Sequence, residues 1–221
     1  MKRAVGLTLA CCLLLLVQIA VSISEQEFAP TGIHIALTGI EDEMSIMFFT
    51  LAESDKYSIF YSTEKDSVEF LKNHVEVSEH NKFFTYRVEG MYRPLTIHEI
   101  ILRHLKPATR YFYKVVPMDH PYMSSEVYSF TTQKAKQELM EGNKKSFEFL
   151  VLGDSDIFDA ARRTYGSIEK NQMTKTQFIV HVGDLSYVWG PGNENKWESW
   201  FDLVEPIAAN IPYIVCNGRL C

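Results

Sequence analysis

Short apolar runs follow one another through the first half of the chain. Most are about five to seven residues long, rich in β-branched and aromatic residues, and separated by turn or charged residues. They cover residues 32–37, 44–50, 57–62, 83–88, 97–102, 111–116 and 126–131. Seven short strands in about 110 residues are typical of an immunoglobulin-like sandwich. We therefore expect residues 25–132 to form an all-β domain of two packed sheets.

One turn in this region carries a sharper signal. The segment Leu105-Lys106-Pro107-Ala108-Thr109-Arg110-Tyr111 places a tyrosine at the start of a late strand. In sandwiches of this kind such a tyrosine returns its hydroxyl to the backbone and fixes the corner. The spacing resembles that of fibronectin type III domains, so we expect a fibronectin type III-like sandwich.

The pattern changes after a polar stretch, residues 133–146, which we interpret as a linker. Beyond it, residues 147–152, 178–182 and 211–215 form nearly continuous apolar runs, as in strands buried on both faces. Helical patterns lie between them, at residues 159–175 and from Asn195 onward. We expect Asp156 or Asp159 to cap the first helix, and Pro206 to kink or end the second. The order strand–helix–strand–helix–strand predicts a parallel sheet with right-handed crossovers over residues 147–221.

The N-terminus has the features of a targeting segment. Lys2 and Arg3 precede an apolar run over residues 4–21, and small residues follow at Ser22 and Ser24. This order predicts a signal peptide over residues 1–24, a secreted/extracellular or lysosome-like location, and no membrane association after cleavage. An uncleaved signal anchor is the alternative, because the apolar run is nearly long enough to span a bilayer.

The composition and the net charge narrow the range of possible partners. The formal net charge of −6 and the pI of about 5.7 argue against a nucleic-acid partner, which normally meets a basic surface. Hydrophobic residues make up 46% of the chain, which is enough to fill a core. The sequence predicts no oligomeric state.

Two aspartates stand where open parallel sheets bind their ligands. Asp154 and Asp184 each follow a glycine at the carboxyl end of an expected strand, and they lie 30 residues apart, about one strand–helix–strand unit. Two carboxylates at one spot repel each other unless a cation lies between them, so a bridging metal is the economical explanation. Tyr187 could add a phenolate oxygen. The plain alternative is that both aspartates cap the turns that follow them, and we expect His181 to be a structural partner.

The motifs around these residues closely resemble purple acid phosphatases, which are dinuclear metallophosphoesterases with a fibronectin-like N-terminal domain. The resemblance rests on Gly153-Asp154, on Gly183-Asp184-Leu185-Ser186-Tyr187, on Trp197, Trp200 and Glu205-Pro206-Ile207-Ala208, and on Pro212-Tyr213-Ile214-Val215-Cys216. It implies the first half of an α/β metallophosphoesterase domain after the sandwich. It also implies that Asp154 and Tyr187 bind Fe(III), and that Asp184 bridges to a second divalent metal, Fe, Zn or Mn. The implied activity is hydrolysis of phosphate monoesters.

The sequence departs from the family at its end. The family continues with Gly-Asn-His-Glu, whereas this chain has Arg219, Leu220 and Cys221 after Gly218. Leu220 thus stands in the place of the family histidine, and the later histidine motifs are absent. We interpret the chain as a C-terminally truncated family member that retains no catalytic residue and is inactive. The alternatives are a secreted fragment that binds a partner through its sandwich domain, and a chain that misfolds because its sheet is cut short.

Overall fold

The structure is a computed structural model. It describes residues 26–54, 56–72, 74–77, 82–86, 95–134, 148–187, 195–216 and 218. The expected signal peptide (residues 1–24) and residues 219–221 lie outside these ranges. The expected linker also lies outside them, except for residues 133 and 134.

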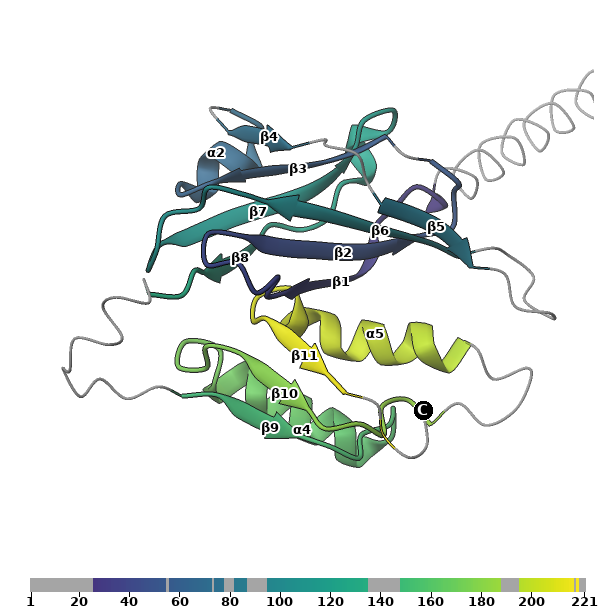
Figure 1. The fold of residues 1–221 in the computed structure, drawn as a ribbon. Coiled ribbons are helices and arrows are strands. Elements are labelled where there is room, and N and C mark those ends of the chain that lie inside the picture. The colour runs from purple at the N-terminus through teal and green to yellow at the C-terminus, as the bar shows by residue number, and fades with distance from the viewer. Residues whose placement is uncertain are drawn as a thin grey trace, which may run out of the picture.

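The first half is a sandwich of two antiparallel four-stranded sheets, as the sequence predicted (Figure 1). One sheet has the order β1-β2-β6-β5 and the other the order β4-β3-β7-β8. The bounds are β1 Thr31–Ala36, β2 Met44–Thr50, β3 Tyr57–Ser62, β4 Val75–Val77, β5 Lys82–Tyr86, β6 Leu95–Leu102, β7 Arg110–Pro117 and β8 Tyr128–Thr131. Alternating positions of the two inner faces form the core, including Ile35, Ile46, Ile59 and Val115, each with no exposed surface.

The expected tyrosine corner is present, because the backbone N–H of Lys106 donates to the Tyr111 hydroxyl at 2.9 Å. Three short elements escaped the sequence pattern. They are β4, helix α2 (Lys65–Glu69) and the 3₁₀ turn η1 (Pro121–Met123). Each spans only three to five residues, which is too short for a periodic signal.

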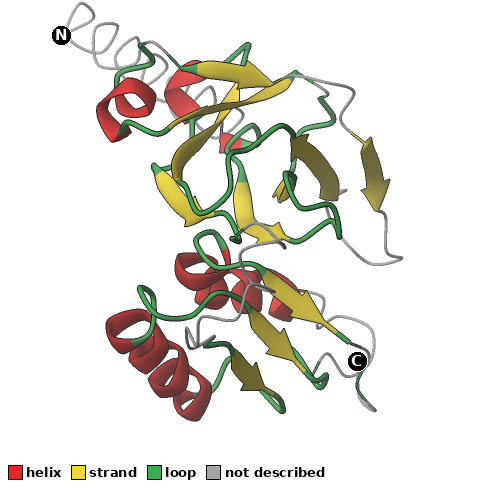
Figure 2. Ribbon diagram, turned by 60° about the vertical axis from the view of Figure 1, so that its left-hand side comes forward, coloured by secondary structure: helices red, strands yellow, loops and turns green. Residues whose placement is uncertain are grey.

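The second half contains the expected parallel sheet, in the order β11-β10-β9. Its strands are β9 Leu150–Leu152, β10 Ile179–His181 and β11 Tyr213–Val215, each shorter than the apolar run that predicted it. Helix α4 (Asp159–Asn171) joins β9 to β10, and helix α5 (Asn195–Ala208) joins β10 to β11. Both helices pack on the same face of the sheet (Figure 2). The side chains of Val151 and Ile214 point to the other face and are exposed.

The expected cap of the first helix was wrong, and Pro206 does not end the second helix. Phe158 is the N-cap of α4 and makes no side-chain capping bond, because the Asp156 carboxylate instead accepts from the N–H of Ile157 at 2.7 Å. Pro206 neither ends α5 nor stops its hydrogen bonding, since the helix continues to Ala208 and the N–H of Ala209 still donates to Glu205.

Helix α5 lies between the small sheet and the sandwich, along β1 (Figure 1). The buried Tyr113 hydroxyl donates to the carbonyl of Ala209 at 2.6 Å, and the Tyr128 hydroxyl donates to the Glu205 carboxylate at 2.6 Å. Phe201 stacks on His34 with ring centroids 5.5 Å apart. The sandwich therefore holds the helix whose other side supports the sheet of the second half.

Candidate metal centre

The loops after β9 and β10 are joined directly to each other. The backbone N–H of Asp154 donates to the carbonyl of Gly183 at 3.2 Å, and that of Ser155 donates to the carbonyl of Asp184 at 2.9 Å. These bonds extend the parallel pairing of the strands by two residues. The structure thus brings Asp154 and Asp184 to one edge of the sheet, at its carboxyl end.

Tyr187 joins the same site, because its hydroxyl donates to the Asp154 carboxylate. This bond, together with some desolvation and the negative charges of Asp154, Asp184 and Asp156, raises the pKa of Tyr187 to about 12. The phenol is therefore neutral in the protein alone. A cation among these oxygens would favour the phenolate instead.

The backbone at the three residues is unusual. Asp154 and Asp184 have φ of 56°, and Tyr187 has φ of 50°. Left-handed backbone is tolerated by aspartate but is costly for a bulky residue, and such conformations gather at functional sites. Gly218 allows a close backbone approach to Asp184. Its backbone lies directly against Asp184, so that any side chain at 218 would collide with the Asp184 amide and carboxylate.

A hollow of about 430 Å³ opens beside these groups, lined by Asp154, Asp156, Phe158, Ala160, Ala161 and Tyr187. Lys196, near the start of α5, contacts both of the loops that carry these groups. Its ammonium donates to the carbonyl of Tyr187 at 3.2 Å and lies 3.9 Å from the Asp156 carboxylate. Lys196 therefore links α5 to both loops, a role that the sequence pattern gave no reason to expect.

His181 lies beneath the loops and is fully buried. Its Nδ1 is 2.9 Å from the Tyr213 hydroxyl and its Nε2 is 3.5 Å from the Ser155 hydroxyl. Burial lowers the pKa of His181 to about 4, so its imidazole is neutral. Because both ring nitrogens already have partners, the structure gives His181 a place in the interior rather than in the hollow.

The donor set suits one hard cation. Two carboxylates and a phenol supply oxygen ligands of the kind that hard, highly charged ions prefer. Within the described part of the chain, no three His, Cys, Asp or Glu side chains converge on a metal-sized site. The described residues thus fit the oxygen-ligated side of a two-metal centre and supply no imidazole to it. Leu220 lies outside the described residues.

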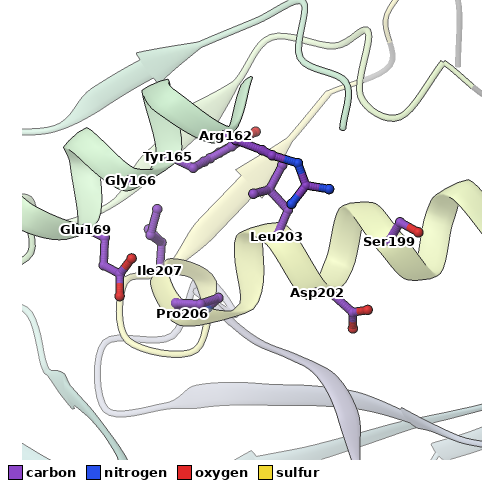
Figure 3. Close-up of a pocket in the computed structure, with 9 residues that line it drawn as sticks. All are labelled: Arg162, Tyr165, Gly166, Glu169, Ser199, Asp202, Leu203, Pro206 and Ile207. Atoms are coloured by element: carbon purple, nitrogen blue, oxygen red, sulfur yellow. The ribbon is translucent and has the colours of Figure 1, made fainter. Parts of the chain in front are cut away.

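A separate hollow of about 390 Å³ lies between α4 and α5 (Figure 3). It contains Arg162, Glu169 and Asp202, with the two carboxylates at opposite ends of the hollow. The Arg162 guanidinium donates to the carbonyl of Ile157 at 3.0 Å. These charged groups do not converge on one point, and none of the predicted site residues lines this hollow.

Comparison with known proteins agrees with this architecture. The family of purple acid phosphatase N-terminal domains matches residues 30–132. The chain is 23% identical over 212 residues to a protein named probable inactive purple acid phosphatase 9 from Arabidopsis thaliana, a match that covers 86% of this chain and 30% of that protein. It is 24% identical over 204 residues to a phosphoenolpyruvate phosphatase from Allium cepa, covering 90% and 38%. It is 24% identical over 212 residues to human acid phosphatase type 7, covering 94% and 44%.

A solved structure shows the same fold. The purple acid phosphatase from yellow lupin seeds superposes with a TM-score of 0.69 over 86% of this chain and 35% of that chain, at 19% sequence identity. The fold is thus a fibronectin-like sandwich joined to a three-stranded parallel sheet, as in that structure. Residues 30–132 match the purple acid phosphatase N-terminal domain, and most of the chain is similar in sequence to proteins named purple acid phosphatases. The matches span 30%, 38% and 44% of the length of the three relatives named above.

Proposed function

We propose that this chain supplies the oxygen-donor half of a dinuclear metal centre that hydrolyses phosphate monoesters. The observation that carries the proposal is the direct joining of the β9 and β10 loops, which places Asp154, Asp184 and Tyr187 together. The relatives support the reaction class, because several are named acid phosphatases.

In this proposal Asp154 and Tyr187 would be ligands of Fe(III), and Asp184 would be a ligand both of Fe(III) and of a second divalent ion, Fe, Zn or Mn. A bound centre of this kind polarises phosphoryl oxygens and lowers the pKa of water. The protein's own part is to keep three oxygen donors close together before the metal arrives. Lys196 would limit the movement of the loops through the carbonyl of Tyr187 and the carboxylate of Asp156.

We propose further that these 221 residues do not turn over substrate by themselves. Six of the seven histidines precede residue 121, in the sandwich half, and His181 is engaged in the interior. The family histidine has Leu220 in its place. An alternative role of the sandwich as a binding module remains a prediction from the sequence. So does secretion through residues 1–24. Among the described residues, no helix has both the length and the apolar character needed to cross a membrane.

Terbium(III) is a suitable probe for the site, because it is a hard trivalent ion whose luminescence is excited through nearby aromatic rings. We expect the chain to bind it, and Asp154→Asn and Asp184→Asn each to weaken binding by at least about tenfold. Asp119→Asn changes the charge equally on the sandwich, where Asp119 pairs with Lys56, and should leave binding unchanged. Equal binding by all four proteins would refute the site.

The catalytic half of the proposal has its own assay. The chain is purified without metal, reloaded with Fe and Zn, and given p-nitrophenyl phosphate. We expect no hydrolysis above that of Asp184→Asn treated in the same way. Turnover that disappears in Asp184→Asn would show a complete centre and contradict the inactive state.

A further inference from the structure

A closed ring of hydrogen bonds lies directly beneath the candidate centre. The Tyr165 hydroxyl donates to Ser155 Oγ at 2.9 Å, and the hydroxyls of Tyr165 and Tyr213 are 3.3 Å apart. Tyr213 meets His181 Nδ1 at 2.9 Å, and His181 Nε2 returns to Ser155 Oγ at 3.5 Å. We call these four residues the Ser155 ring. They come from the β9 loop, α4, β10 and β11, so the ring ties four elements together.

The ring uses the full hydrogen-bonding capacity of its central serine. A hydroxyl offers one donor and two acceptor sites. Ser155 Oγ accepts from Tyr165 and also from the indole N–H of Trp200 at 3.1 Å, which leaves its own proton for His181 Nε2. His181 Nε2 is therefore the acceptor, and Nδ1 carries the imidazole proton and donates it to the Tyr213 hydroxyl. The ring thus selects a single neutral tautomer of the imidazole.

Ser155 connects the ring to the candidate metal ligands. Its side chain forms the bonds of the ring, while its backbone N–H donates to the carbonyl of Asp184. Asp154 is the residue directly before it in the chain. Both aspartates have left-handed backbone, which costs free energy and persists only where the surroundings fix it. An anchored residue next to Asp154 provides such a constraint.

We infer that Ser155 is a positioning residue, which through its buried ring fixes the carboxylate of Asp154 against that of Asp184. This inference rests on the proposed function. Groups behind the direct ligands orient them, and changing such groups typically lowers metal affinity by about 10- to 100-fold. Serine next to aspartate carries no signal in the sequence, because the partners of its hydroxyl come from residues 10 to 45 positions away.

The first test concerns the ring itself and needs no metal. Nitrogen-15 NMR of the His181 imidazole at neutral pH should show one neutral tautomer in the unchanged protein and a mixture of tautomers in Ser155→Ala. A mixture in the unchanged protein would show that the ring does not close, and would overturn the inference.

The second test measures terbium(III) affinity. We expect Ser155→Ala to bind about 10-fold or more weakly, and Ser155→Thr, which keeps the hydroxyl, to stay within about threefold of the unchanged protein. Ile168→Ala removes a buried apolar side chain from the same core and takes away none of the hydrogen-bonding groups of the ring, so it controls for lost stability.

The outcomes separate cleanly. If Asp154→Asn binds as well as the unchanged protein, the proposed function fails, whatever Ser155 does. If Asp154→Asn loses affinity but Ser155→Ala does not, only the positioning role fails. It also fails if Ile168→Ala, still folded, loses as much affinity as Ser155→Ala, or if Ser155→Thr does not restore binding.

Discussion

At the scale of single residues, the sharpest constraints lie where the backbone turns left-handed. Gly32 has φ of 60°, and a side chain there would meet the ring of Phe49 and the Cβ of Phe201 from α5. Phe49 packs edge-on against Phe201 with centroids 4.6 Å apart, so its ring has little room to move. Gly32 is thus required both by its conformation and by the close approach of α5.

Gly32→Ala should therefore destabilise the protein by about 2–4 kcal/mol, combining roughly 1 kcal/mol for the backbone with the cost of overpacking. Gly39 offers a matched control, because its φ is 87° but, apart from its two chain neighbours, none of the described residues has an atom within 4 Å of the point where an added methyl group would stand. Gly39→Ala should cost only about 1 kcal/mol. Urea unfolding measures both, and equal losses would mean that the contact with Phe49 is unimportant.

At the scale of elements, the sequence predicted most of the architecture because the long elements carry strong periodicity. Seven of the eight sandwich strands and the order of the parallel sheet were predicted from apolar runs alone. The sequence also indicated the edge at which Asp154 and Asp184 would meet, since parallel strands end on the same side. The elements missed were short, and the wrong N-cap arose because Asp156 bonds to its neighbour Ile157 rather than to the helix.

What the sequence could not show were contacts between distant side chains. Lys196, from α5, contacts Tyr187 in the loop after β10 and Asp156 in the loop after β9. The Ser155 ring likewise depends on the packing of four elements against one another. Spacing along the chain does not encode such contacts, and the hydroxyls involved belong to common residue types.

The docking of α5 can be tested at one bond. Tyr113 is fully buried, and its hydroxyl donates to the carbonyl of Ala209 across the junction at 2.6 Å. Tyr113→Phe leaves that buried carbonyl without its donor and should cost about 1–3 kcal/mol. Tyr61→Phe removes a hydroxyl from the same sheet, with no hydrogen-bond partner among the described residues, and should change stability by less than about 0.5 kcal/mol. Equal effects in urea unfolding would show that the junction bond contributes nothing.

At the scale of the whole molecule, the half-buried His34 of the sandwich and the buried His181 of the second half couple folding to pH. Burial lowers the pKa of His34, which stacks on Phe201 at the junction, and lowers the pKa of His181 to about 4. Unfolded histidine titrates near pH ~6.5. Between these values the unfolded chain binds more protons than the folded one, so stability falls as the pH is lowered through this window. Burial raises the pKa of Glu205, so this carboxyl takes up its proton earlier in the folded state and opposes the loss.

Between about pH 7 and pH 5, His181 alone should remove about 2 kcal/mol from the free energy of unfolding, given its folded pKa near 4. His181→Gln should lower stability at neutral pH, because it disturbs the Ser155 ring, yet flatten the dependence on pH. His104→Gln makes the same substitution at an exposed position and serves as the control. Urea unfolding at the two pH values gives the slopes directly, and parallel slopes for all three proteins would mean that His181 titrates normally in the fold.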